Sequence, residues 1–309
     1  MLNIVFMGTP DFSVPILEAL NEVYNVSLVV TQPDKLVGRK QELKYSPVKE
    51  CALKLGIEVF QPEKIRKDYQ AILDKKPDLI VTAAYGQIIG QKVLECAKYK
   101  AINVHGSLLP KYRGGAPIQR AIMNGDKETG ITIMYMAKGM DSGDILAMRK
   151  EPIMENDTAG DLFNRLSLVG RDLLMETIPS LIKGEIIPLK QDEEQVTYAY
   201  NINKEEEELN LSNDATSVVN IIRGLNPNPL AHIYLGNEKT PENKLKIARA
   251  TVSELSTNQD PGTIIDIKKK YFTIACGDNT AIDIHEVIPF GKRLMKASDF
   301  INGGLKKYL

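Results

Sequence analysis

Apolar runs of strand length recur along the first half of the chain. They occupy residues 4–7, 26–30, 79–83, 101–104 and 131–134. Segments with the amphipathic periodicity of helices lie between most of them, and these cover residues 13–23, 49–55 and, at greater length, 158–183. Strands that alternate with helices are typical of a parallel sheet covered on both faces. We therefore expect an α/β domain built on a Rossmann-like, doubly wound parallel sheet.

The pattern changes after residue 190. Residues 191–206 are polar and predict a linker between a domain of residues 1–190 and a second domain of residues 207–309. In the second domain we expect a helix at residues 215–223 and short strands at residues 232–235, 244–250, 262–267, 271–275 and 281–287. Short strands at such regular spacing are typical of a small β-barrel.

Composition and charge narrow the choice of function only slightly. The 309 residues include 39 Lys and Arg against 40 Asp and Glu, so the net charge neither supports nor excludes a nucleic-acid partner. The three cysteines are scattered and the three histidines show no paired spacing, so neither a disulfide framework nor a metal site is expected. No apolar run approaches the roughly 20 residues that span a membrane, and no targeting segment precedes the first strand. These features predict a cytoplasmic protein, with a monomer as the default state.

The glycine loop of a dinucleotide-binding fold is missing after the first strand. Gly8, Thr9 and Pro10 stand where a G-x-G-x-x-G motif would begin, and only the first glycine is present. Such a loop lacks the backbone access that a pyrophosphate needs. NAD is therefore not an expected cofactor, although the sheet is of the doubly wound type.

Two polar residues interrupt an apolar strand near its end. Asn103 and His105 are two positions apart, so a strand places them on the same face. A second motif, G-M-D-S-G-D, holds Asp141 between two glycines, where the backbone can approach a ligand. A carboxylate near an imidazole stabilises its charged form, and a neighbouring amide can donate to a developing oxyanion. Because the nearby Ser107 lacks the G-x-S-x-G elbow of hydrolases, this set predicts attack on a carbonyl by a nucleophile of the substrate.

These motifs resemble those of the folate-dependent formyltransferases. Asn103-x-His105, Ser107-Leu108-Leu109-Pro110 and Asp141 stand in the family's order and at its spacing. The resemblance covers nearly the whole chain and is densest in residues 4–145. Within the family, further segments are most similar to the members that formylate methionyl-tRNA, and they include Thr31-Gln32-Pro33-Asp34, Ser46-Pro47-Val48-Lys49, Ala84-Tyr85-Gly86 and Gly115-Ala116-Pro117-Ile118-Gln119-Arg120.

The resemblance implies transfer of the formyl group of 10-formyltetrahydrofolate to the α-amine of methionyl initiator tRNA. Asn103 and protonated His105 would stabilise the tetrahedral oxyanion, while Asp141 would hold His105 charged and help to move protons. The family also contacts its folate through the serine–proline segment and pairs the pterin ring with backbone after an earlier strand. The residues implied in folate binding are Ser107, Leu108, Leu109, Pro110, Tyr85, Gly86, Gln87 and Ile88.

A basic stretch at residues 35–49 is the second informative segment. It holds five positive residues and a single negative one, and such a run is often no more than a solvated surface loop. The resemblance implies that it enters the acceptor arm of the tRNA, and that the second domain is an OB-like tRNA-binding domain. The residues implied in tRNA contact are Lys35, Arg39, Lys40, Lys44 and Arg113.

Three alternatives stay open from the sequence. A sugar-nucleotide formyltransferase shares the three motifs and also carries a small C-terminal domain, although the basic stretch weighs against it. A purine-pathway formyltransferase would leave the second domain without a role. A non-catalytic tRNA-binding module is disfavoured because Asn103, His105 and Asp141 are all present.

Overall fold

The structure is a computed structural model that describes residues 1–37, 41–236 and 238–305. It divides into two compact units that interleave along the chain. The first unit contains residues 1–117, 128–152 and 163–200, and the second contains the described parts of residues 118–127, 153–162 and 201–309. The domain limits expected at residues 190 and 207 stay a prediction.

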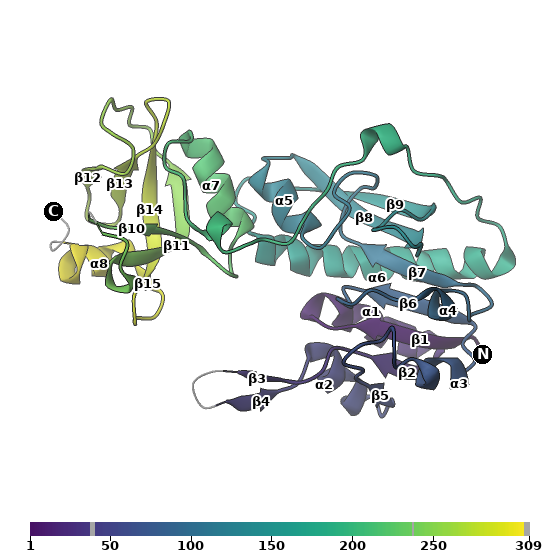
Figure 1. The fold of residues 1–309 in the computed structure, drawn as a ribbon. Helices are drawn as coiled ribbons and strands as arrows, with labels where there is room; N and C mark the ends of the chain where they lie inside the picture. Colours follow the sequence, from purple (N-terminus) through teal and green to yellow (C-terminus); the bar gives the residue numbers. More distant parts are fainter. Residues whose placement is uncertain (38–40, 237, 306–309) are drawn as a thin grey trace. The chain divides into compact units, whose positions relative to one another are not determined.

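The first unit is built on a seven-stranded sheet with the order β5-β2-β1-β6-β7-β8-β9 (Figure 1). Its first five strands are parallel, which confirms the predicted α/β class with a parallel core. In sheet order these strands are β5 (Val59–Phe60), β2 (Asn25–Val30), β1 (Asn3–Gly8), β6 (Leu79–Ala83) and β7 (Ala101–His105).

The last two strands of this sheet differ from the expected pattern. β8 (Glu128–Tyr135) runs antiparallel to β7, and β9 (Ile145–Pro152), for which the sequence predicts no strand, pairs antiparallel with β8. β9 lies at the edge of the sheet and alternates half-buried with exposed positions beyond Ala147. An edge strand of this kind has no continuous apolar run, which is why the apolar pattern does not predict it.

The helices of the first unit begin where the sequence carries helix-start signals. The Ser46 hydroxyl accepts a hydrogen bond from the Lys49 amide, and Pro47 follows at the first helical position. The long helix ends before Gly184, whose φ of +71° suits a residue without a Cβ. The helices are α1 (Val14–Val23), α2 (Pro47–Lys54), α3 (Gln70–Asp74), α4 (Gln91–Leu94), α5 (Pro117–Met123) and α6 (Ala159–Lys183). The unit boundaries fall inside α5, after Pro117, and inside α6, before Phe163.

Helices cover both faces of the parallel strands. On one face, Val5 and Ile80 share a buried cluster with Ile72 of α3 and Val93 of α4. On the other face α6 lies so close to β7 that a Cβ added at Gly170 would stand 2.9 Å from a methyl group of Val104. Burial on both faces explains why these strands appear in the sequence as continuous apolar runs.

A two-stranded hairpin occupies part of the basic stretch. β3 (Lys35–Val37) pairs antiparallel with β4 (Glu42–Lys44), so Lys35 lies opposite Lys44 and Leu36 lies opposite Leu43. Directly opposed residues share a face, and the two leucines are 59% and 58% exposed. The hairpin therefore carries a lysine pair on one face and an uncovered apolar pair on the other.

The second unit contains an antiparallel sheet with the order β10-β11-β14-β13-β12, with β15 added beside β14. The strands are β10 (Ala231–Tyr234), β11 (Lys244–Val252), β14 (Ala281–Pro289), β13 (Phe272–Ala275), β12 (Ile264–Ile267) and β15 (Met295–Lys296), and the helices are α7 (Ala215–Gly224) and α8 (Ala297–Gly303). Val218 and Ile222 of α7 share a core with Phe272 of β13. The predicted second domain of short strands is confirmed, and its strands are antiparallel, while its OB-like barrel character stays a prediction.

The described helices differ from those that span membranes. Within the part of the chain that the structure describes, no helix combines the length and the apolar character that crossing a membrane requires. The longest helix, α6, carries charged residues along its length and is amphipathic.

Candidate active site

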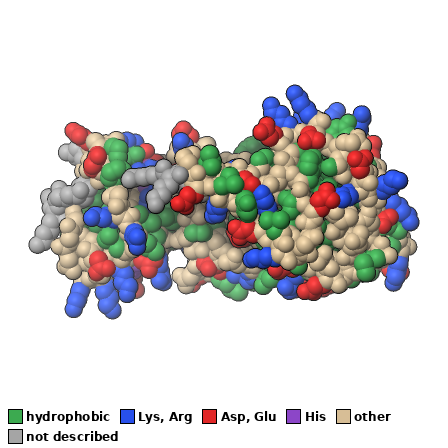
Figure 2. Space-filling view, turned by 90° about the horizontal axis from the view of Figure 1, so that it is seen from below, with side chains coloured by type: hydrophobic (Ala, Val, Ile, Leu, Met, Phe, Trp, Pro, Cys, Tyr) green, Lys and Arg blue, Asp and Glu red, His purple; other side chains and the backbone are tan. Residues whose placement is uncertain are grey.

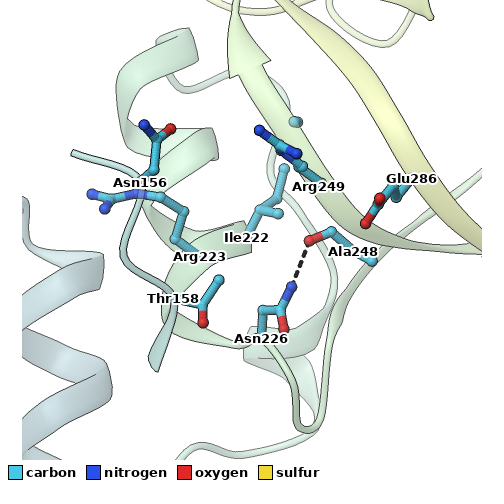
Figure 3. A pocket seen from close by; sticks show the side chains of 9 residues that line it. Asn156, Thr158, Ile222, Arg223, Asn226, Ala248, Arg249 and Glu286 are labelled. Atoms are coloured by element: carbon cyan, nitrogen blue, oxygen red, sulfur yellow. Dashed lines mark hydrogen bonds between the residues drawn. The ribbon is translucent and has the colours of Figure 1, made fainter. Parts of the chain in front are cut away.

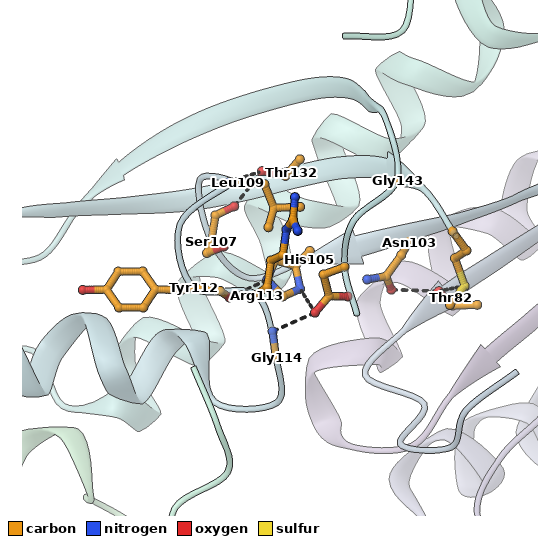
Figure 4. Close-up of polar contacts among 12 residues, drawn as sticks. Thr82, Asn103, His105, Ser107, Leu109, Tyr112, Arg113, Gly114, Thr132 and Gly143 are labelled. Atoms are coloured by element: carbon orange, nitrogen blue, oxygen red, sulfur yellow. Dashed lines mark hydrogen bonds and ion pairs between the residues drawn. The ribbon is translucent and has the colours of Figure 1, made fainter. Parts of the chain in front are cut away.

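The polar pair of β7 lies at the carboxyl edge of the parallel sheet. Asn103 and His105 project from the same side of the strand, and His105 is its last residue (Figure 4). Ligands of open α/β sheets bind at this edge, beside the loops that follow the strands. The loop after β1 reaches the loop after β6, because the Thr9 hydroxyl donates to the Tyr85 carbonyl oxygen at 2.9 Å.

Asn103 is held in one orientation by the neighbouring strand. The hydroxyl of Thr82 on β6 donates to the Asn103 side-chain oxygen at 2.7 Å. Because this contact occupies the oxygen, the amide nitrogen of Asn103 remains as a donor for a ligand. Thr82 was not among the residues predicted from the sequence. Its signal there is a hydroxyl within an otherwise apolar strand, which can hydrogen-bond a polar side chain on a neighbouring strand.

His105 is 5% exposed, and both of its ring nitrogens face oxygen atoms. Nε2 lies 3.0 Å from the carbonyl oxygen of Tyr112, which only accepts hydrogen bonds, so Nε2 carries a proton. Nδ1 lies 3.7 Å from a carboxylate oxygen of Asp141, within ion-pair range but too far for a hydrogen bond. Nδ1 is therefore the ring nitrogen that can donate a hydrogen bond to negative charge developing on a substrate.

The carboxylate of Asp141 is fixed by the surrounding backbone. It accepts a hydrogen bond from the Gly114 amide at 2.8 Å, and Asp141 itself has a left-handed φ of +44°. A glycine is needed at position 143 of the same turn, because a Cβ added there would lie 1.9 Å from the Tyr135 carbonyl oxygen. The structure thus brings Asp141 to His105 across 36 positions of sequence, as a shared catalytic site requires.

The Ser107–Pro110 segment forms a tightly bonded turn. Ser107 is fully buried, and its hydroxyl donates to the Lys111 carbonyl oxygen at 2.7 Å. The hydroxyl of Thr132 donates to the Ser107 carbonyl oxygen at 2.7 Å and accepts from the Leu109 amide at 3.1 Å. The Ser107 hydroxyl is thus used within the turn, and the partly exposed Leu108 and Pro110 are the residues of this segment that can contact a ligand.

The segment after β6 is tied to the loop that contains Gln32. The Tyr85 carbonyl oxygen accepts from the Gln32 side chain at 3.1 Å, in addition to the bond from Thr9. Burial raises the pKa of the Tyr85 phenol to about 12. Gln87 donates to the Pro62 carbonyl oxygen at 2.9 Å, whereas Ile88 is 67% exposed. Ile88 is therefore the side chain of this segment that is most available to a ligand.

Comparison with known proteins places this geometry in a family. Residues 2–178 match a model described as formyl transferase, and residues 201–305 match one described as formyl transferase, C-terminal domain. A methionyl-tRNA formyltransferase of Latilactobacillus sakei is 52% identical over 98% of this chain and 95% of its own length. One of Lactiplantibacillus plantarum is 52% identical over 100% of this chain and 97% of its own length. The chain belongs to the methionyl-tRNA formyltransferase family.

Solved structures support the same fold for this formyltransferase. An N-formyltransferase of Helicobacter canadensis, solved with folinic acid and dTDP-3-aminofucose, superposes with a TM-score of 0.69 at 24% identity and covers 92% of this chain and 99% of its own. A methionyl-tRNA formyltransferase from Clostridium thermocellum gives a TM-score of 0.59 at 22% identity and covers 90% of this chain and 100% of its own. At these identities the likeness concerns the fold alone.

The predicted tRNA contacts of the formyltransferase fall into three structural classes. Lys35 and Lys44 are exposed on the β3–β4 hairpin, and neither ammonium lies within 4.0 Å of a carboxylate among the described residues. Arg39 and Lys40 lie outside the described residues. Arg113 is only 3% exposed, and its guanidinium donates to both carboxylate oxygens of Glu193, at 2.8 and 3.2 Å. A tRNA contact by Arg113 would require this pair to open.

Lys49, the last cation of the basic stretch, has a structural partner. Its ammonium pairs with Asp34 at 2.5 Å and lies 3.8 Å from the centre of the Tyr45 ring. Burial alone would raise the pKa of Asp34, but hydrogen bonds from Lys49 and Gln61 outweigh it and hold that pKa below its ordinary value. The Asp34 carboxyl therefore stays ionised at neutral pH, and its pair with Lys49 fastens the base of the hairpin.

The face drawn in Figure 2 carries charges of both signs, with Lys and Arg side chains interspersed with Asp and Glu side chains. Among the described residues, no group of three or more His, Cys, Asp or Glu side chains could hold a metal ion. The described charges therefore do not by themselves single out one large basic surface.

The second unit of the formyltransferase contains a cavity of about 250 Å³ (Figure 3). Arg223 reaches it from α7 and donates to the carbonyl oxygens of Met154 and Asp157, at 3.2 and 3.0 Å. The other lining residues are Asn156, Thr158, Ile222, Asn226, Ala248, Arg249, Ala250 and Glu286. None of the residues predicted to act in catalysis, folate binding or tRNA binding lines this cavity.

Proposed function

We propose that this protein transfers the formyl group of 10-formyltetrahydrofolate to the α-amine of methionyl initiator tRNA and so produces N-formylmethionyl-tRNA. The observation that carries the proposal is the meeting of Asn103, His105 and Asp141 at the carboxyl edge of the sheet. The substrate follows from relatives that are 52% identical over almost the full chain and are named methionyl-tRNA formyltransferases.

The three residues, which we call the catalytic cluster, suit formyl transfer. The α-amine of the methionyl group attacks the formyl carbon, and the C–O π electrons move to the oxygen. The amide nitrogen of Asn103 and Nδ1–H of His105 donate to this oxyanion. The C–N bond to the folate nitrogen then breaks, and the proton lost by the amine is transferred to that nitrogen. Asp141 stabilises the imidazolium of His105 and assists this transfer.

The residues present also suit a folate as the formyl donor. The Asn103 amide and the His105 ring are both donors, as the oxygen of a formyl group requires. Ile88 presents an apolar side chain on the loop after β6, and the remaining predicted folate residues shape the adjoining backbone. We expect contacts to the pterin through backbone groups of residues 86–88, since the Tyr85 carbonyl oxygen already accepts two hydrogen bonds.

The tRNA contact is proposed for the β3–β4 hairpin. Lys35 and Lys44 lie opposite each other and are exposed, which suits two phosphate contacts on one face. Arg39 and Lys40 belong to the same stretch of sequence and are included in the proposal. We further expect the protein to act in the cytoplasm as a monomer.

A substrate competition tests the proposal. Purified protein receives 10-formyltetrahydrofolate together with methionyl initiator tRNA and, in parallel, a nucleotide-linked amino sugar. Formylation of the tRNA alone is the expected result. Formylation of the sugar alone would keep the catalytic cluster in its role and overturn the tRNA assignment, and activity on neither would favour a binding module without catalysis.

A further inference from the structure

We infer that Gln191 is a positioning residue for Asp141, and this inference rests on the proposed function. Gln191 lies in the polar segment that follows α6, some 50 positions from Asp141 in sequence. Its side-chain nitrogen donates to the Asp141 carbonyl oxygen at 2.7 Å and to the Gly143 carbonyl oxygen at 2.8 Å. Both acceptors belong to the turn that carries the catalytic carboxylate.

The side-chain amide of Gln191 can take only one orientation. Its oxygen accepts from Nε of Arg113 at 2.9 Å, whereas its nitrogen faces the two carbonyl oxygens. Reversing the amide would place an oxygen against two acceptors and a nitrogen against a donor. All of these partners lie in the first unit, so one amide group joins the loop after β7 to the loop that contains Asp141.

The turn around Asp141 needs such a support. Asp141 has a left-handed φ of +44°, which residues with a Cβ rarely adopt unless the surrounding structure imposes it. By binding the carbonyl groups of residues 141 and 143, Gln191 fixes the backbone on both sides of Ser142. The direction of the Asp141 side chain then follows, with its carboxylate 2.8 Å from the Gly114 amide nitrogen and 3.7 Å from Nδ1 of His105.

Gln191 is itself anchored by the segment in which it lies. Arg113 is bonded to Gln191 and, through two further hydrogen bonds, to Glu193, and the two bonds to Glu193 lower the pKa of that carboxyl. The backbone continues the attachment, because the Arg113 amide donates to the Thr197 carbonyl oxygen at 2.9 Å and its carbonyl oxygen accepts from the Ala199 amide at 2.7 Å. Residues 191–199 therefore act as a strap that carries Gln191 to the turn.

The substitution Gln191→Glu separates the two ends of this side chain. It retains an oxygen for Arg113 and replaces the amide nitrogen by a carboxylate oxygen that repels the two carbonyl groups. We expect kcat for methionyl-tRNA formylation to fall about 10- to 100-fold, as misplaced catalytic groups do, with KM for both substrates and the unfolding temperature close to wild type. Gln191→Met, which removes the donor without adding charge, should give the same loss.

Gln195→Glu is the matched control. Among the described residues the Gln195 side chain donates to Asp192 within the same strap, at 2.6 Å, and has no bond to the loop that contains Asp141, so this variant should keep the wild-type kcat. The decisive measurement combines Gln191→Glu with Asp141→Asn. If Gln191 acts through Asp141, the double variant should be no slower than Asp141→Asn alone, because the group that Gln191 positions has already lost its charge.

The outcomes separate this inference from the function on which it rests. An active wild type with a Gln191→Glu variant within twofold of it, or with losses that multiply in the double variant, would overturn the positioning role alone. A wild type that does not formylate methionyl-tRNA would overturn the proposed function, and the inference with it.

Discussion

The catalytic cluster and the β3–β4 hairpin differ in how firmly the fold holds them. Each member of the cluster has a defined protein partner: Thr82 for Asn103, the Tyr112 carbonyl for His105 and the Gly114 amide for Asp141. The described part of the hairpin is fastened at its base by the Asp34–Lys49 pair, and its described lysines and leucines, Lys35, Leu36, Leu43 and Lys44, are exposed. Preorganisation is therefore greater at the residues proposed for catalysis than at those proposed for tRNA contact.

This difference follows from the physics of the two tasks. Stabilising an oxyanion needs donors within a few tenths of an ångström of the right place, because hydrogen bonds are short and directional. Attraction of a lysine to phosphates acts over roughly 8–10 Å at ordinary ionic strength and tolerates movement. Substitutions in the two regions should therefore change different kinetic constants.

The largest effect is expected from the catalytic cluster itself. His105→Ala should lower kcat about 10²- to 10⁴-fold, and Asn103→Ala about 10²- to 10³-fold, because each removes a donor to the oxyanion. KM for the tRNA should change little, and steady-state kinetics at saturating folate measure both constants. His285→Ala is the control, since His285 bonds to Thr251 in the second unit. A His105→Ala variant within tenfold of wild type would contradict the oxyanion role.

A smaller loss is expected when only the support of Asn103 is removed. Thr82→Val keeps the shape of the side chain and deletes the hydroxyl that donates to the Asn103 oxygen, so the amide loses its fixed orientation. We expect kcat to fall about tenfold, as imprecise placement of a catalytic group does, with unchanged tRNA binding. Thr129→Val is the matched control, because the buried Thr129 hydroxyl has no hydrogen-bond partner among the described residues. Equal losses in the two valine variants would argue against the support.

Substitutions in the hairpin should change KM for methionyl-tRNA and leave kcat unchanged. Lys35→Ala combined with Lys44→Ala should raise KM for methionyl-tRNA about tenfold at moderate salt and leave kcat at saturation unchanged. The slope of log affinity against log salt should become shallower by about 0.7 to 0.9 for each phosphate that a lysine no longer neutralises. Lys150→Ala serves as the control, because that exposed lysine pairs with Glu128 on the edge of the sheet. An unaltered salt slope would remove the hairpin from the RNA interface.

The smallest effect is expected at the base of the hairpin. Asp34→Asn removes the partner of Lys49, and a partly exposed ion pair of this kind contributes at most about 1 kcal/mol, so KM for the tRNA should rise only about two- to threefold. The folded-state pKa of Asp34 is lowered, so its contribution to stability is present above its ordinary value of 3.8 and is lost as pH falls through the folded value. Between pH 6 and 8 the effect of Asp34→Asn on KM should therefore be constant.

The sequence predicted the parts of this molecule that depend on local periodicity. The parallel strands β1, β2, β6 and β7 appeared as continuous apolar runs because both of their faces are buried, and α6 appeared because its apolar stripe covers 25 residues before Gly184. Asn103 and His105 were detected for the same reason, since polar residues stand out against a buried strand.

The sequence could not predict the contacts that depend on distant segments. Gln191 lies in a polar stretch that looked like a linker, and only the folded chain shows it bonded to residues 113, 141 and 143. Arg113 looked like a surface cation because its partner Glu193 is 80 positions away. In the β3–β4 hairpin, Leu36 and Leu43 are both exposed, so these apolar residues carry none of the periodicity that marks a strand in a core.

One measurement tests most directly whether the catalytic cluster sets the rate of formyl transfer and the hairpin sets the affinity for tRNA. Single-turnover formyl transfer is followed against methionyl-tRNA concentration for wild type, His105→Ala and the Lys35→Ala, Lys44→Ala double variant. We expect the hairpin variant to reach the wild-type rate at high tRNA concentration, while His105→Ala stays slow at every concentration. A hairpin variant that remains slow at saturation, or a His105→Ala variant rescued by more tRNA, would contradict this expectation.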